Sequence, residues 1–215
     1  MANNYYDEII HIKVNSVEIE GSLAIPENVR GIVLFAHGSG SSRYSPRNNF
    51  VAEILRKNGF ATLLIDLLTE NEDLVYKTRF DIDLLTNRLL VVTRWLQSQD
   101  KTEKLLIGYF GASTGAASAL KAAAKLGNVI KAVVSRGGRP DLAEPDLSKV
   151  QAPTLLIVGG NDKVVIELNQ EAYDKLVSEK ELTIIPGATH LFEESGALEE
   201  VANLASLWFK RYLIQ

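Results

Sequence analysis

Short apolar runs alternate along the chain with longer segments whose apolar residues have helical spacing. The runs that predict strands buried on both faces are residues 31–36, 60–66, 105–107, 130–135, 153–158 and 182–185. From residue 81 to residue 96, apolar side chains at helical spacing predict a helix with one buried face. Ahead of these runs, alternating apolar and polar residues from 17 to 23 predict one arm of an antiparallel hairpin over residues 9–25.

The order of these elements predicts an α/β fold in a single domain over residues 1–215. Strands that alternate with helices through short connections form a parallel sheet with helices on both faces. We therefore expect a mostly parallel central sheet with the N-terminal antiparallel hairpin beside it. Ser45 and Pro46 predict the start of a helix that runs to about Asn58. A further helix is expected over residues 165–179, and residues 67–79 suit a polar loop at a carboxyl end of the sheet.

Composition narrows the class of protein. The 215 residues are 46% hydrophobic and 23% charged, as in an ordinary globular domain. A net charge of −4 without a basic block argues against a nucleic-acid partner. The absence of cysteine excludes a disulfide scaffold, a thiolate nucleophile and cysteine-ligated zinc. With neither a signal peptide nor a membrane-spanning apolar run in the sequence, we expect a cytoplasmic monomer or weak homodimer with no membrane partner.

The clearest candidate chemistry lies in Gly111-Ala112-Ser113-Thr114-Gly115, a G-x-S-x-G sequence between an apolar run and an alanine-rich helical segment. In this motif the serine occupies a sharp strand-to-helix turn that exposes its hydroxyl. The flanking glycines leave room for the neighbouring strand and the start of the helix. Ser113 is therefore the candidate nucleophile.

Two further polar residues follow later buried strands in the order that a serine triad requires. Asp162 and His190 each come just past the carboxyl end of a predicted strand, and these ends meet at one edge of a parallel sheet. An imidazole can take the serine proton near neutral pH, and a carboxylate can orient that imidazole. The alternatives are a helix-capping role for Asp162 and a buried structural role for His190.

Residues 37–43, HGSGSSR, follow the first buried strand and can supply an oxyanion hole. We expect the backbone N–H groups of Thr114 and Ser39 to bind the oxyanion, and His37 to brace the loop. A phosphate-binding function is disfavoured because the loop has neither a G-x-G-x-x-G pattern nor the Gly-Lys-Ser/Thr end of a P-loop. His11, in the hairpin, is expected to be a structural or surface residue.

With these motifs in place, the chain resembles the α/β-hydrolase superfamily and, within it, the dienelactone-hydrolase-like proteins. The motifs that carry the resemblance are HGSGSSR at 37–43, GASTG at 111–115, GGND at 159–162 and GATH at 187–190. The likeness covers almost the whole chain and implies a hydrolase with an α/β-hydrolase fold. Dienelactone hydrolases proper carry cysteine as the nucleophile, so Ser113 leaves lactone specificity open. Similar sequences also occur joined to a phosphoribosyltransferase domain, which we do not expect in this chain.

Four arginines lie in loops at the same predicted edge: Arg43, Arg47, Arg136 and Arg139. A guanidinium group can bind a substrate carboxylate or phosphate through two parallel hydrogen bonds. The alternative is that these arginines pair with nearby acids, namely Glu70, Glu72, Asp73 or Asp141. Arg43 and Arg136 are the candidate substrate-binding residues, and Arg136 is preferred because it directly follows a strand.

Together these features predict a serine hydrolase of small to medium carboxylic esters, lactones or thioesters, with a substrate that can be anionic. The reaction would pass through an acyl-enzyme and needs no metal or organic cofactor. An acyltransferase with the same triad and a non-catalytic binding domain with the same fold are the alternatives.

Overall fold

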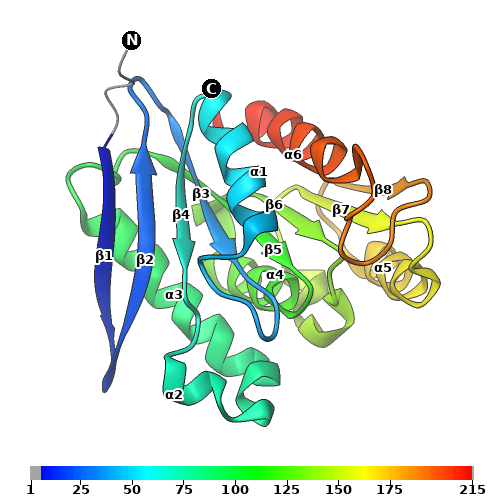
Figure 1. Ribbon diagram of the computed structural model, residues 1–215, viewed down its shortest axis with the longest axis horizontal. Coiled ribbons are helices and arrows are strands. Elements are labelled where there is room, and N and C mark those ends of the chain that lie inside the picture. Colours follow the sequence, from blue (N-terminus) through cyan, green and yellow to red (C-terminus); the bar gives the residue numbers. More distant parts are fainter. Residues whose placement is uncertain (1–5, 215) are drawn as a thin grey trace.

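Eight strands form one sheet in the order β1-β2-β4-β3-β5-β6-β7-β8 in the computed structural model, which describes residues 6–214 (Figure 1). The strands are β1 Tyr6–Val14, β2 Val17–Ile25, β3 Gly31–Ala36, β4 Phe60–Ile65, β5 Leu106–Ala112, β6 Ile130–Arg136, β7 Thr154–Gly159 and β8 Lys180–Ile185. Strand β2 is antiparallel to β1 and to β4, and all other neighbours are parallel. This confirms the mostly parallel sheet with an N-terminal hairpin. The first five residues, part of the segment searched for a signal peptide, lie outside the described residues.

Helices cover both faces of the sheet (Figure 1). Helices α1 (Pro46–Lys57) and α6 (Ala197–Leu213) pack on one face, and α3 (Ile82–Ser98), α4 (Thr114–Leu126) and α5 (Lys163–Lys175) pack on the other. Within the described residues, no helix is long and apolar enough to cross a membrane.

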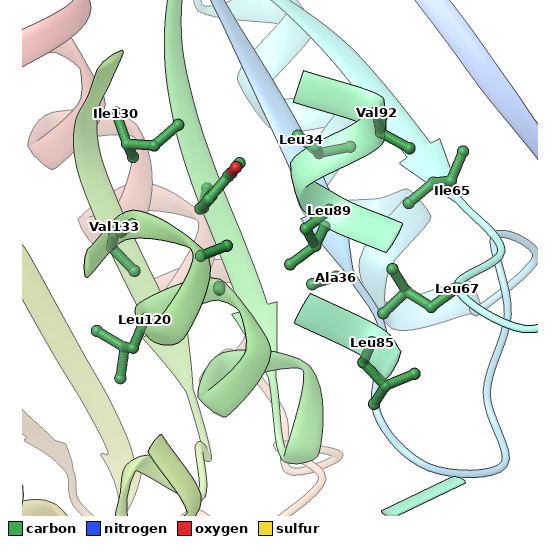
Figure 2. Close-up of a cluster of buried hydrophobic side chains, with 14 of the residues drawn as sticks. Leu34, Ala36, Ile65, Leu67, Leu85, Leu89, Val92, Leu120, Ile130 and Val133 are labelled. Carbon is green, nitrogen blue, oxygen red and sulfur yellow. The ribbon is translucent and has the colours of Figure 1, made fainter. Parts of the chain in front are cut away.

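Each central strand contributes side chains to two separate hydrophobic cores, one on each face of the sheet, because successive side chains of a strand point to opposite sides. In β3, Leu34 and Ala36 enter the core under α3 and α4, whereas Phe35 enters the core under α1 and α6. Figure 2 shows the first core, where Leu85 and Leu89 of α3 lie over strand residues such as Leu34. Buried strands of this kind fix where their carboxyl ends lie.

Helix α4 lies close to the sheet because its inner face carries small side chains. Ala116, Ala117 and Ala119 are completely buried there. The helix therefore starts directly at the end of β5, and its first turn belongs to the candidate site.

Three boundaries differ from the sequence-based expectation. The segment expected to be a polar loop over 67–79 contains a short helix, α2 (Glu70–Asp73), whose start is closed by a capping box of Thr69 and Glu72. A 3₁₀ helix, η1 (Tyr76–Phe80), follows it without a side-chain cap. Strand β5 continues to Ala112, past Gly108, whose missing side chain makes room for Phe209.

Helix α5 ends at Lys175, earlier than expected. The Lys180 ammonium group donates hydrogen bonds to the carbonyl oxygens of Tyr173 (2.6 Å) and Leu176 (2.7 Å). It thereby satisfies acceptors at the helix end and lets β8 begin at Lys180.

The predicted start of α1 is confirmed, since Ser45 Oγ accepts a hydrogen bond from the Asn48 backbone N–H at 3.3 Å. Ser45→Ala should lower the free energy of unfolding by about 1 kcal/mol, because that N–H loses its acceptor. Ser45→Thr is the matched control, since it keeps a hydroxyl at the cap. Urea unfolding of the three proteins tests this, and equal stability of Ser45→Ala and wild type would contradict it.

Candidate active site

Ser113 forms the one-residue turn between β5 and α4, and its backbone has φ 50° and ψ −121°. A residue other than glycine at positive φ is strained, so the surrounding structure must hold it. The Ser113 N–H donates to the Arg136 carbonyl oxygen (3.3 Å), and the Ser113 carbonyl oxygen accepts from the N–H groups of Ala116 (3.1 Å) and Arg139 (3.1 Å). The turn is thereby fixed to β6, to α4 and to the loop after β6.

The glycines of the motif allow this turn to fit. A Cβ atom on Gly111 would lie 2.4 Å from Ala116 Cα, and one on Gly115 would lie 2.2 Å from the Ala36 carbonyl oxygen. Both contacts are with backbone atoms, which cannot move aside as a flexible side chain can. The close approach that the sequence motif predicts is therefore present.

Asp162 and His190 form a hydrogen-bonded pair at the carboxyl ends of β7 and β8. His190 Nδ1 lies 2.6 Å from Asp162 Oδ2. Since a carboxylate only accepts hydrogen bonds, Nδ1 carries the proton and Nε2 has its lone pair available. The side chain of Asp162 makes no capping hydrogen bond to α5, so the capping alternative is not observed.

Backbone and side-chain contacts hold this pair in place. A Cβ atom on Gly159 would lie 2.5 Å from the Ala188 carbonyl oxygen, so the two strand ends approach closely only with glycine there. The Glu194 carboxylate accepts hydrogen bonds from the Thr189 N–H (3.1 Å) and hydroxyl (2.7 Å). These hydrogen bonds lower the pKa of Glu194 and fix the loop that carries His190. The sequence does not identify Glu194 as part of the site, because an acid in a polar loop gives no signal of its partner.

The serine turn lies next to both the oxyanion loop and the histidine loop. A Cβ atom on Gly38 would lie 3.0 Å from Ser113 Cβ, and one on Gly137 would lie 3.5 Å from His190 Cε1. Within residues 6–214, the Ser113 hydroxyl makes no hydrogen bond, so the structure pairs His190 with Asp162 but not with Ser113.

His37 braces the loop after β3. Its Nδ1 lies 2.9 Å from the Gly38 carbonyl oxygen, and its Nε2 accepts the Leu67 N–H at 3.0 Å. Burial lowers the pKa of His37 below its ordinary value of 6.5. The neutral ring thus joins the β3 loop to the segment after β4.

Ser39 and Thr114, the two residues expected to bind an oxyanion, contact each other. The Ser39 N–H donates to Thr114 Oγ1 at 2.9 Å, and Thr114 is buried. The Thr114 hydroxyl thereby holds the β3 loop against the first turn of α4.

The arginines at this edge have different surroundings. Arg43 forms ion pairs with Asp66 and Glu20, and Arg139 forms two hydrogen bonds to Asp141, at 2.8 Å and 2.7 Å. Asp141 was among the expected acids, whereas the partners of Arg43 were not. Both of these guanidinium groups are therefore already paired with carboxylates of the chain. Arg47 pairs with Glu193 at 3.0 Å.

Arg136 differs from these arginines, since no carboxylate among the described residues pairs with it. Nowhere in residues 6–214 do three or more His, Asp or Glu side chains form a group that could hold a metal ion.

The mostly parallel eight-stranded sheet, with helices on both faces and an antiparallel N-terminal hairpin, is an α/β-hydrolase fold. Residues 19–213 match the dienelactone hydrolase family, and the chain belongs to that family. A dienelactone hydrolase from Anabaena variabilis, known from its crystal structure, is 55% identical in sequence to this chain. The two structures superpose with a TM-score of 0.95 over 97% of this chain and 99% of that chain. Est1E from Butyrivibrio proteoclasticus shares the fold at 18% identity, with a TM-score of 0.81 over 94% of this chain and 98% of that one.

A curated relative from Mycobacterium tuberculosis carries a different name, "Putative phosphoribosyl transferase". It is 57% identical over 207 residues, which are 96% of this chain and 47% of that protein. The chain therefore spans about half the length of the curated relatives that it matches.

The neutral state of His37 predicts a pH-dependent stability. Below about pH 6.5 the unfolded chain gains a proton on His37 that the native state does not take up. The free energy of unfolding therefore decreases as the pH is lowered. His37→Gln removes this proton uptake. Between about pH 7.5 and pH 5.5, the free energy of unfolding should fall more steeply for wild type than for His37→Gln, by up to about 1.4 kcal/mol per pH unit.

Urea unfolding at several pH values measures this difference. His11→Gln is the control, because His11 lies on the hairpin with its side chain half exposed. Equal pH slopes for wild type and His37→Gln would show that His37 is not held neutral.

Proposed function

We propose that the protein is a serine hydrolase of small to medium carboxylic esters, lactones or thioesters, with Ser113, Asp162 and His190 as its catalytic triad. The observation that carries the proposal is Ser113 at positive φ between β5 and α4, beside a hydrogen-bonded Asp162–His190 pair at the same sheet edge. The position of the chain within the dienelactone hydrolase family supports ester hydrolysis.

In the first half of the reaction, the Ser113 hydroxyl oxygen attacks the substrate carbonyl carbon while His190 Nε2 takes the hydroxyl proton. Asp162 stabilises the imidazolium that forms, through the hydrogen bond at Nδ1. The leaving group then departs with the proton from Nε2, which leaves an acyl group on Ser113. The proposal requires Ser113 Oγ and His190 Nε2 to come into hydrogen-bond contact when substrate binds.

The tetrahedral oxyanion is bound by backbone N–H groups of Thr114 and Ser39. The Thr114 N–H is at the start of α4, where the partial positive charge of the helix favours an anion. The Ser39 N–H donates to Thr114 Oγ1 in this structure, so the oxyanion replaces that hydroxyl as its acceptor.

In the second half, His190 Nε2 takes a proton from water as the water oxygen attacks the acyl carbon, and it then returns that proton to Ser113 Oγ as the acid is released. No group beyond the triad and the two N–H donors is needed, and the reaction as proposed uses no cofactor.

A fluorophosphonate probe tests whether Ser113 is an activated nucleophile. The probe should label Ser113 in wild type, as mapped by peptide mass spectrometry, because His190 raises the reactivity of that hydroxyl. Ser113→Ala and His190→Ala should lose the label, whereas His11→Ala should keep it, since His11 lies on the hairpin.

Circular dichroism of each variant confirms that it is folded. A folded wild-type protein that is not labelled would contradict the proposal and favour the non-catalytic binding domain. Loss of acid release, with transfer of the acyl group to an added alcohol or amine, would identify the acyltransferase instead.

A further inference from the structure

Arg136 is a buried cation without an acidic partner. It is only 7% exposed, and within residues 6–214 its guanidinium group makes one hydrogen bond, from Nη2 to Asn48 Oδ1, a neutral acceptor, at 3.3 Å. Its Nε atom is buried and has no hydrogen-bond partner among the described residues. The Phe192 ring centroid lies 5.8 Å from the guanidinium carbon. Such a group loses its hydration without gaining a counter-charge.

The other buried arginines of this protein have carboxylate partners. Arg43, 9% exposed, pairs with Asp66 and Glu20, and Arg88, 4% exposed, pairs with Glu72 at 2.6 Å. Buried charges in proteins are normally paired in this way, because an isolated buried ion costs several kcal/mol. The contrast indicates that the partner of Arg136 is an anion from outside the chain.

The surroundings of Arg136 favour such an anion. Asn48 belongs to the first turn of the twelve-residue helix α1, whose N-terminal end carries partial positive charge. Burial and the nearby positive charge of Arg47 lower the pKa of Arg136 to about 10, so the guanidinium stays protonated at neutral pH. Arg47 itself is paired with Glu193, whose carboxylate is largely exposed.

The position of Arg136 connects this charge to the proposed reaction. Its carbonyl oxygen accepts the Ser113 N–H, and it is in register with Ala112, the residue before the nucleophile. Phe192, which lies over the guanidinium, is on the loop that carries His190. The strand end that carries Arg136 therefore adjoins the nucleophile, and its guanidinium group contacts the loop that carries His190.

We infer that Arg136 and Asn48, at the N-terminal end of α1, form a binding site for an anionic group of the substrate, a carboxylate or a phosphate. The assignment of the anion to a substrate rests on the proposed function, whereas anion binding itself does not. The site makes Arg136 a specificity-determining residue for acidic esters.

Kinetics with two esters of equal chain length test the specificity. We compare 4-nitrophenyl hydrogen glutarate with 4-nitrophenyl pentanoate, and the rate with Ser113→Ala is subtracted as background. Arg136→Met should lower kcat/KM for the acidic ester by about tenfold or more, and change that for the neutral ester by less than about twofold. For Arg136→Lys, kcat/KM for the acidic ester should lie between the values for wild type and Arg136→Met, because an ammonium group keeps the charge but cannot form two parallel hydrogen bonds as a guanidinium does.

Arg211→Met is the matched control, since Arg211 pairs with Glu179 on the exposed surface and should leave both esters unaffected. Equal losses on the two esters in Arg136→Met would overturn the inference while leaving the hydrolase intact. Arg136→Met should also be at least as stable as wild type in thermal unfolding, because an unpaired buried charge is removed. A clear fall in its Tm would show a structural role and overturn the inference.

Anion binding is measured without turnover in Ser113→Ala. Glutarate or inorganic phosphate should raise the Tm of Ser113→Ala, and neither should raise that of the double variant Ser113→Ala/Arg136→Met. A shift with only one of the two identifies a carboxylate or a phosphate as the preferred group. No shift with either anion overturns the site, and a shift in a protein that hydrolyses no ester supports the site while contradicting the proposed function.

Discussion

The strained turn at Ser113 is the constraint on which the rest of the site depends. A serine at positive φ is maintained only because β6, α4 and the loop after β6 all hydrogen-bond its backbone. Those contacts in turn require backbone approaches that only Gly111 and Gly115 permit. The two fully packed faces of the sheet keep β5 and α4 rigid around that turn. The packed core therefore holds Ser113 in its strained conformation, and the turn presents the Ser113 hydroxyl at the sheet edge.

Much of this could be predicted from the sequence because the relevant signals are local. The G-x-S-x-G motif, the Ser45 cap and the apolar runs each depend on a few neighbouring residues, and the structure confirms the turn, the cap and the parallel sheet. The hydrogen bond between Asp162 and His190 also follows from strand order, because parallel strand ends share one edge. The Ser39 N–H was expected to be available, yet it donates to Thr114 Oγ1, a contact between residues 75 positions apart that no local pattern encodes.

The arginines show why charged residues are harder to place. Their long side chains reach partners far along the chain, so a sequence cannot tell an ion pair from a substrate contact. Arg43 is bound by Asp66 and Glu20, whereas the guanidinium group of Arg136, the last residue of β6, hydrogen-bonds only to Asn48 among the described residues. Burial decides between the two cases, because a buried cation without an acid needs an anion from elsewhere. Of the four arginines expected near the site, Arg136 is therefore the one for which we propose a preference for anions.

The central claim is that Ser113 becomes acylated during turnover. Rapid mixing with excess 4-nitrophenyl acetate, acid quenching and intact-mass analysis measure this directly, with peptide mapping of the modified residue. We predict one acetyl group on Ser113 that forms together with an initial burst of 4-nitrophenol, disappears when the ester is exhausted, and is absent in Ser113→Ala. Steady hydrolysis that is retained in Ser113→Ala, with no acetyl group on Ser113 in wild type, would contradict the account.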